Sequence, residues 1–208
     1  MPLALPLVAL AFHGTIQPLP TTVRAEIVNG GSWHTGCPVP LSRLRLMTVS
    51  TWGFDGSAQT GQMIVNQNAA APLLRVLQRL YALKFPIRRM TLALAYSATS
   101  AQANAADESS GFSCRNAVAS PCSGTSSTAH WSEHAYGEAV DLNPIENPYV
   151  GCGTTRIRAS RPYVKRTPRR PGMVTPAVVQ AFRSIGWGWG GNWTGSTKDY
   201  MHFSATGH

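Results

Sequence analysis

Residues 131–144 limit the fold of this chain more than any other stretch. They place His134, Gly137 and Asp141 within eight residues. Residues 139–143 then alternate, so that Asp141 faces away from its two apolar neighbours, as in a half-buried strand. A strand that begins beneath a metal ion and turns a carboxylate towards it would produce this pattern. We therefore expect a ligand site at the start of a strand, completed by a residue from elsewhere.

The missing ligand lies near the far end of the sequence, where Asp199 is followed three residues later by His202. Catalytic zinc is held by three His or carboxylate ligands, and a fourth position is left to water. His134, Asp141 and His202 would supply these ligands for one Zn²⁺ ion. Asp199 reaches the same place without being a ligand, and is positioned to move a proton from the attacking water to a leaving amine. The spacing alone is a weak pattern, because most histidines are ordinary core or surface residues. The other histidines are assigned to that class: His13, His34, His130 and His208.

Two further side chains are candidates for the same site. An oxyanion that develops on a scissile carbonyl needs a cation or donor besides the metal, and Arg115 in a long polar loop can provide it. The Gly- and Trp-rich run 186–193 reads either as packing or as an aromatic wall for a ligand. We assign Trp187 to packing and take Trp189 as a candidate substrate contact.

The net charge of +9 reflects scarce acids as much as abundant bases. Only nine Asp and Glu residues are present, and seven of the 18 basic side chains lie in a basic loop, residues 156–170. This loop is either a solvated face or a surface for an anionic partner such as nucleic acid, acidic lipid or an acidic wall polymer. No apolar run approaches the roughly 18 residues that would span a membrane.

Four cysteines are present without a C-x-x-C pair, which disfavours a structural thiolate zinc site. Two disulfides in an oxidising compartment explain Cys37, Cys114, Cys122 and Cys152 better than four buried thiols do. The apolar residues 3–10 lack a basic flank, so they are either the remnant of a signal peptide or a plain apolar element. We expect an exported monomer.

Periodicity and breaker residues predict the other elements. Strands are expected over residues 61–66, 89–96, 139–143 and 200–204. Helices are expected from Pro72 to Leu83 and, with Thr175 as N-cap, from Pro176 to Ile185. Loops are expected over residues 13–40, 97–130 and 144–174. Helix and strand are mixed without a βαβ rhythm, so the predicted class is α+β, with residues 1–32 as an N-terminal segment and extended arm before a domain over 33–208.

Taken together, the motifs resemble the zinc D-alanyl-D-alanine carboxypeptidase family. The resemblance lies first in Ser132-x-His134-x-x-Gly137-x-Ala139-x-Asp141 and in Asp199-x-x-His202. It extends to Phe112-Ser113-Cys114-Arg115, to residues 186–193, and to the runs 36–39 and 52–56. The family includes L-alanyl-D-glutamate endopeptidases and shares its fold with the Hedgehog signalling domain. The chain is most similar to secreted actinobacterial members.

This resemblance implies a small antiparallel sheet flanked by helices, and a zinc peptidase acting on the peptidoglycan stem peptide. It implies that His134, Asp141 and His202 hold the zinc and that Asp199 is the base. It assigns Arg115 to the carbonyl oxygen and Ser132 to the substrate peptide.

Two features depart from the general family pattern. Cys122 and Cys152 are additional to that pattern. Of the three possible pairings of four cysteines, we therefore choose Cys37 with Cys114 and Cys122 with Cys152. A Cys122–Cys152 bridge would clamp two loops beside the zinc and narrow the cleft. The basic loop is longer and more positive than the chemistry requires, and we expect it to hold the enzyme on anionic wall polymer.

Three functions are therefore weighed. The first is a D-alanyl-D-alanine carboxypeptidase-like enzyme of the cell envelope, with an L-alanyl-D-glutamate-type endopeptidase as its alternative. The second is a non-catalytic zinc module that binds cell wall, which the intact Asp199 disfavours. The third is a nucleic-acid-binding protein, which is suggested only by charge and which export would exclude.

Overall fold

The computed structural model describes residues 11–92 and 100–208. Within these residues, helices are mixed with four small antiparallel sheets, in agreement with the predicted α+β class. The predicted apolar segment 3–10 and the second half of the predicted strand 89–96 lie outside the described residues. No helix in the described part is long and apolar enough to cross a membrane.

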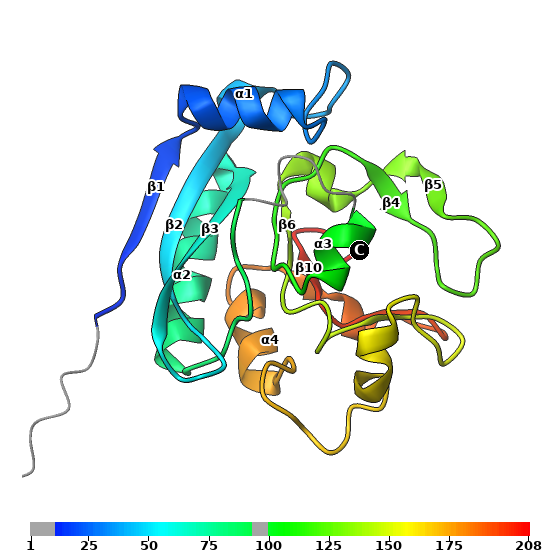
Figure 1. The fold of residues 1–208 in the computed structure, drawn as a ribbon. Coiled ribbons are helices and arrows are strands. Elements are labelled where there is room, and N and C mark those ends of the chain that lie inside the picture. The colour runs from blue at the N-terminus through cyan, green and yellow to red at the C-terminus, as the bar shows by residue number, and fades with distance from the viewer. Residues whose placement is uncertain (1–10, 93–99) are drawn as a thin grey trace, which may run out of the picture.

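The larger sheet has the order β1-β2-β3, and helix α2 lies against it (Figure 1). Its strands are β1 (Gly14–Pro18), β2 (Leu44–Trp52) and β3 (Ala58–Asn66). An Asp55-Gly56 turn closes the β2–β3 hairpin, where Gly56 has a φ of 76° that favours glycine. Residues 89–92 form only an isolated bridge, Arg89 to Glu108, so in the described residues the predicted strand there is wrong.

Helix α2 (Gln67–Ala82) begins earlier than Pro72, where the sequence predicted its start. The side chain of Asn66 caps it by accepting a hydrogen bond from the backbone N of Asn68, at 3.1 Å. Its apolar face is as predicted, with Leu73, Val76, Leu77 and Leu80 buried.

The N-terminal region is more ordered than the predicted arm or loop over residues 13–40. Strand β1 pairs along its whole length with β2, and helix α1 (Thr21–Asn29) buries Val23 and Ile27. The prediction is wrong because these short elements are stabilised by contacts with β2 rather than by a local periodic pattern.

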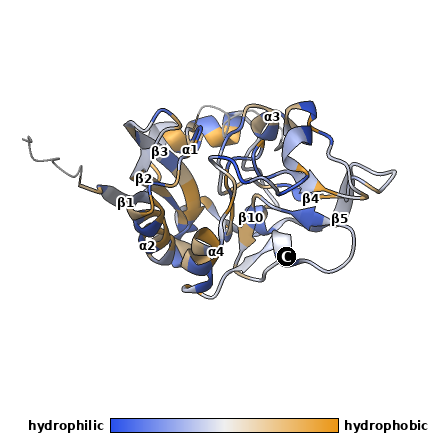
Figure 2. Cartoon of the chain, turned by 90° about the horizontal axis from the view of Figure 1, so that it is seen from below, coloured by the Kyte–Doolittle hydropathy of each residue, from blue (hydrophilic) through white to orange (hydrophobic). Residues whose placement is uncertain are grey.

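A second, smaller sheet has the order β6-β10-β8 and carries the predicted motif. Its strands are β6 (Ala139–Asp141), β10 (His202–Ser204) and β8 (Gly188–Trp189). The expected alternation holds, because Val140 and Leu142 enter the main hydrophobic core. That core also contains α2, α4 and Phe203, and Figure 2 shows hydrophobic residues gathered where these elements meet the larger sheet. The core fixes the second sheet against the first.

The remaining elements surround this sheet. They are α3 (Ser100–Ala105), β4 (Asn116–Val118), β5 (Ser127–Trp131), β7 (Tyr149–Val150), α4 (Pro176–Arg183) and β9 (Lys198–Asp199). Short 3-10 helices are η1 (Leu41–Arg43), η2 (Glu133–Tyr136), η3 (Arg158–Tyr163) and η4 (Gly190–Asn192). Thr175 caps α4 as predicted, and the described part of the predicted loop 97–130 contains α3 and the β4–β5 hairpin.

Candidate metal and catalytic site

The three predicted ligands come together although they are far apart in sequence. Asp141 on β6 and His202 on β10 are directly paired across the two antiparallel strands, and His134 lies on η2. One ligand atom from each residue lies within 4.8 Å of the others. All three side chains are buried. The structure therefore gathers two imidazoles and one carboxylate around a single point.

Local structure explains how His134 is held beside β6. The side chain of Ser132 accepts a hydrogen bond from the backbone N of His134, at 3.3 Å, and so caps η2. Gly137 ends η2 with a φ of 66°. A Cβ there would lie 2.7 Å from the backbone N of Asn66, which donates to the Gly137 carbonyl. Only glycine allows this turn to pack against β3.

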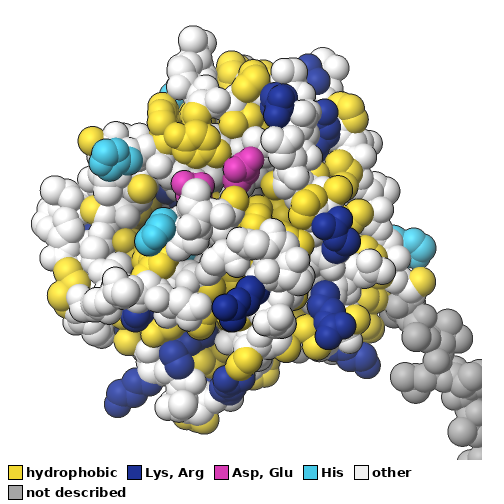
Figure 3. Space-filling view, turned by 180° about the vertical axis from the view of Figure 1, so that it is seen from behind, with side chains coloured by type: hydrophobic (Ala, Val, Ile, Leu, Met, Phe, Trp, Pro, Cys, Tyr) yellow, Lys and Arg dark blue, Asp and Glu magenta, His cyan; other side chains and the backbone are white. Residues whose placement is uncertain are grey.

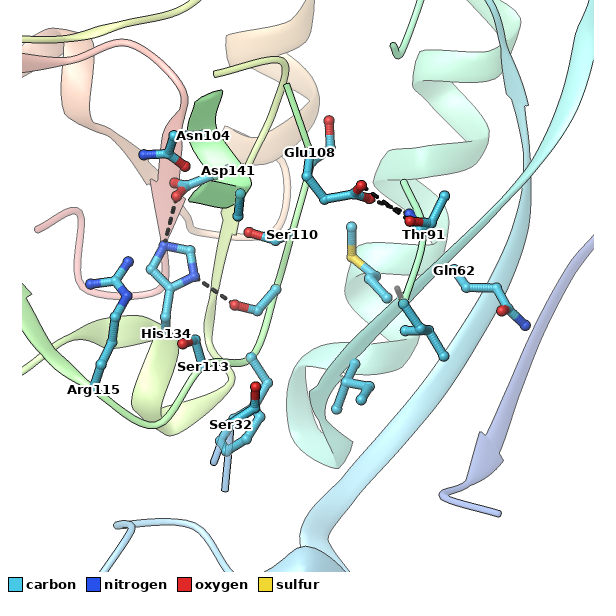
Figure 4. Close-up of a pocket in the computed structure, with 17 residues that line it drawn as sticks. Ser32, Gln62, Thr91, Asn104, Glu108, Ser110, Ser113, Arg115, His134 and Asp141 are labelled. Atoms are coloured by element: carbon cyan, nitrogen blue, oxygen red, sulfur yellow. Dashed lines mark hydrogen bonds and ion pairs between the residues drawn. The ribbon is translucent and has the colours of Figure 1, made fainter. Parts of the chain in front are cut away.

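Backbone carbonyls orient both imidazoles. His134 Nδ1 lies 2.6 Å from the Gly111 carbonyl oxygen, and Figure 4 shows its ring between that carbonyl and Asp141. His202 Nε2 lies 3.1 Å from the His208 carbonyl oxygen. Because a carbonyl only accepts hydrogen bonds, each of these nitrogens carries a proton. In the neutral tautomers, the lone pairs are therefore on His134 Nε2 and His202 Nδ1.

These lone pairs face the Asp141 carboxylate. His134 Nε2 lies 3.2 Å from Asp141 Oδ2, and His202 Nδ1 lies 3.1 Å from Asp141 Oδ1. A proton on His202 would satisfy the second contact, but His134 Nε2 still lacks a hydrogen-bond partner. A cation bound between the two imidazole lone pairs and the Asp141 carboxylate would interact favourably with all three acceptors. Metal-bound histidines also commonly donate their other N–H to a carbonyl, as both histidines do here. The residues fit a zinc ion.

Electrostatics support the neutral form of His134. Burial lowers the pKa of His134, while Asp141 opposes this effect. Burial also works against charge on His202, but its hydrogen bond to Asp141 and the charges of Asp141 and Asp199 raise its pKa. The pKa of Asp141 is lowered, because the two histidines outweigh its burial. Asp141 is therefore ionised and able to ligate.

Asp199 and Arg115 line the same cleft as the ligands. Asp199 lies on β9, paired with Tyr149 on β7, and Arg115 lies just before β4. Asp199 Oδ1 and Arg115 Nε are both buried without a hydrogen-bond partner. Burial and the negative charge of Asp141 raise the pKa of Asp199 to about 7, and burial lowers the pKa of Arg115. An acid that titrates near neutrality is suited to moving protons.

The cleft, with a volume of about 210 Å³, also contains residues that the sequence prediction missed. Trp193 packs edge-on against Tyr149, and its ring centre lies 6.0 Å from that of His202. Its indole N–H donates to the Gly207 carbonyl, which ties the last residues to the cleft wall. His208, assigned from sequence to an ordinary position, lines the cleft and orients His202. The Gly- and Trp-rich run signalled Trp193, whereas no local pattern signalled His208.

The two predicted substrate contacts have different positions. Ser132 lines the cleft beside His134. Trp189 does not line it, because its ring stacks on Phe203 and its indole N–H donates to the Tyr200 carbonyl. Trp189 is a packing residue in this structure. The aromatic side chain from this run that lines the cleft is Trp193.

Both predicted disulfides are confirmed, Cys37–Cys114 and Cys122–Cys152. The first joins the N-terminal region to the residue preceding Arg115. His34 lies beside it, with Nε2 3.5 Å from Cys114 Sγ, but both sulfurs are committed to the disulfide.

The site combines a buried set of candidate metal ligands with an adjacent acid. Residues 125–205 match the family model described as D-alanyl-D-alanine carboxypeptidase. This segment contains the three ligands and Asp199, and the match confirms the family resemblance predicted from the motifs. Neither the curated proteins nor the solved structures contain a match to the chain.

Proposed function

We propose that this protein is a zinc-dependent metallopeptidase that hydrolyses an amide bond in the peptidoglycan stem peptide. One observation carries the proposal. In the described residues, four buried side-chain polar atoms lack a hydrogen-bond partner, and three of them belong to His134, Asp199 and Arg115 in one cleft. Buried polar groups are normally paired, so these three are reserved for a ligand or a reaction. The family match supports the reaction class.

Each residue has a distinct task in this proposal. His134, Asp141 and His202 would hold a zinc ion, which when bound supplies a Lewis acid that polarises a carbonyl and acidifies water. Asp199 accepts a proton from the attacking water and returns it to the leaving amine. The Arg115 guanidinium donates to the oxyanion that develops on the scissile carbonyl.

Ser132 and Trp193 position the substrate. The Ser132 hydroxyl accepts from His134 N and remains free to donate to a peptide carbonyl. Trp193 forms an apolar wall next to His202, which excludes water from one side of the cleft. These contacts orient an amide between Arg115 and Asp199.

We infer a D-alanyl-D-alanine carboxypeptidase-like activity, with cleavage at L-alanyl-D-glutamate as the alternative. The same ligands and acid serve either bond. A non-catalytic wall-binding module is disfavoured, because it has no need of a buried Asp199 whose pKa is raised and whose Oδ1 lacks a hydrogen-bond partner.

The test is to incubate the purified protein with defined muropeptides, with and without a chelator, and to weigh the products. A mass loss that disappears with chelator and returns with stoichiometric Zn²⁺ is expected. The fragment masses identify the bond that is cut. Intact muropeptides in the presence of bound zinc would refute the proposal and favour the binding module.

We further propose that the protein works in the cell envelope and that its basic loop, residues 156–170, holds anionic wall polymer. The structure divides the loop's cations into two groups. Arg166 is structural, because it donates to the Glu146 carbonyl and to Asn147 Oδ1 and lies over the Tyr200 ring. Arg156 is likewise bonded, to the Ser120 and Thr125 carbonyls. The exposed cations available to a polymer are Arg158, Arg161, Lys165, Arg169 and Arg170.

An adjacent cavity of about 680 Å³ is lined by Arg89 and Arg170, which can contribute to the same surface, whereas Arg88 is ion-paired there with Asp107 and Glu146. Figure 3 shows Lys and Arg side chains spread over the lower and right parts of one face, with few acidic side chains among them. Binding to such a polymer should weaken as salt rises, because exposed charges are screened. Binding to isolated cell walls that is independent of salt would contradict this role.

A further inference from the structure

We propose that the substrate is an extended peptide, and that its part beyond the reacting amide lies in a side cavity built by the Cys122–Cys152 loops. This inference rests on the proposed peptidase function. It adds that a free dipeptide is a poor substrate, because it cannot reach the side cavity.

The side cavity adjoins the cleft. It has a volume of about 550 Å³, larger than the cleft itself. Four residues line both spaces: Asn104, Val118, Tyr149 and Met201. Tyr149 is the cross-strand partner of Asp199, so the cavity begins next to the proposed acid. A chain bound at the metal site can therefore continue past Tyr149.

Two loops wall this cavity and are tied together in several ways. The Cys122–Cys152 disulfide joins residues 118–126 to residues 149–157. Arg156 Nη2 donates to the carbonyls of Ser120 and Thr125, at 3.1 and 3.0 Å. These cross-links favour a preformed cavity, whose shape need not be organised on binding.

The lining has the chemistry of a peptide subsite. Val118, Pro121, Ile157 and Met201 provide apolar surface. Ser123, Thr125 and Ser126 also line it. The Ser123 and Thr125 hydroxyls hydrogen-bond to each other, and the Ser126 hydroxyl can bond to a peptide backbone. Arg156 is the only charged side chain in the described lining, and it is already bonded to two carbonyls. This combination suits a neutral peptide segment with small side chains rather than a phosphate or a metal.

Gly124 provides a direct test. It lines the cavity, and a Cβ there would meet nothing within 4 Å. Its φ lies outside the positive range, so Gly124→Trp adds a bulky side chain at the cavity lining without strain in the backbone. Ser127→Trp is the matched control, because Ser127 is exposed on the same hairpin and does not line the cavity.

The experiment measures kcat/KM for a length series, from a blocked dipeptide to peptides extended separately on the amino and carboxyl sides of the cut bond. Wild-type protein should prefer the peptides extended on one side by at least tenfold. Gly124→Trp should remove that preference while leaving the blocked dipeptide unchanged, and Ser127→Trp should behave as wild type.

A second measurement does not depend on turnover. Binding of the extended product peptide to chelator-treated protein, followed by tryptophan fluorescence, should weaken at least tenfold in Gly124→Trp and in the double variant Cys122→Ser, Cys152→Ser. The inference is overturned if Gly124→Trp leaves the length preference intact or lowers kcat/KM equally for all lengths. If the wild type cleaves no peptide at all, the proposed function itself fails, which is a separate result.

Discussion

Replacing Asp199 with Asn should abolish catalysis and, in the metal-free protein, stabilise the fold. An amide cannot carry the proton from water to the leaving amine, so turnover should fall by about 10²–10⁴-fold. Zinc content should not change, because Asp199 is not one of the three converging ligands. The gain in stability follows from the environment of the carboxyl group.

Burial and the charge of Asp141 raise the pKa of Asp199 from its ordinary 3.8 to about 7. A raised folded-state pKa means that the folded protein binds the proton more tightly than the unfolded chain does. Wild-type stability is therefore lost as the pH rises from the unfolded value through 7, whereas Asn has no such dependence. From these two pKa values, the unfolding free energy of Asp199→Asn relative to wild type should increase by about 2–3 kcal/mol between pH 5 and pH 8.

The assay is urea unfolding of chelator-treated protein at the two pH values, together with turnover and zinc content of the loaded enzyme. Glu146→Gln is the matched control. Burial and the neighbouring Asp107 raise the pKa of Glu146 to about 7, and this residue bonds to Arg88 outside the cleft. It should gain stability at pH 8 in the same way and keep full turnover. The reasoning fails if Asp199→Asn retains turnover, or if its stability relative to wild type is the same at both pH values.

Three further outcomes are expected. His202→Ala should lose both zinc and turnover, measured by metal analysis and product mass, and a variant that keeps its zinc would exclude His202 as a ligand. Arg115→Ala should keep zinc but lower kcat by about 10²–10³-fold, the usual effect of removing an oxyanion donor, and an effect confined to KM would assign Arg115 to substrate binding instead. The double variant Cys37→Ser, Cys114→Ser removes a disulfide between residues 77 positions apart. It should lower the unfolding free energy, measured by denaturant titration, by about 2–5 kcal/mol, and unchanged stability would contradict this prediction.

Sequence patterns predicted the elements whose stability is encoded locally. Thr175 followed by Pro176 marks the start of α4, because a side-chain cap and a fixed φ act within one turn. The alternation around Asp141 predicted its strand because burial of one face is recorded in the residue pattern itself, with Val140 and Leu142 in the core. Residues 13–40 were misjudged, since β1 receives its hydrogen bonds from β2, about 30 residues away. Pro72 was read as a helix start, whereas the cap at Asn66 places it inside α2.

By itself, the sequence determined the candidate ligand types, the family resemblance and the acid near the second histidine. The side-chain chemistry of His134, Asp141, Asp199 and His202 does not depend on where the chain places them. Only the tertiary structure decided that β6 and β10 pair Asp141 with His202, and that Trp193, not Trp189, lines the cleft. It also placed the His208 carbonyl at His202 Nε2 and left Asp199 Oδ1 and Arg115 Nε buried without hydrogen-bond partners. Tautomers, raised pKa values and unpaired buried atoms arise from desolvation and long-range contacts, which no local pattern of residues contains.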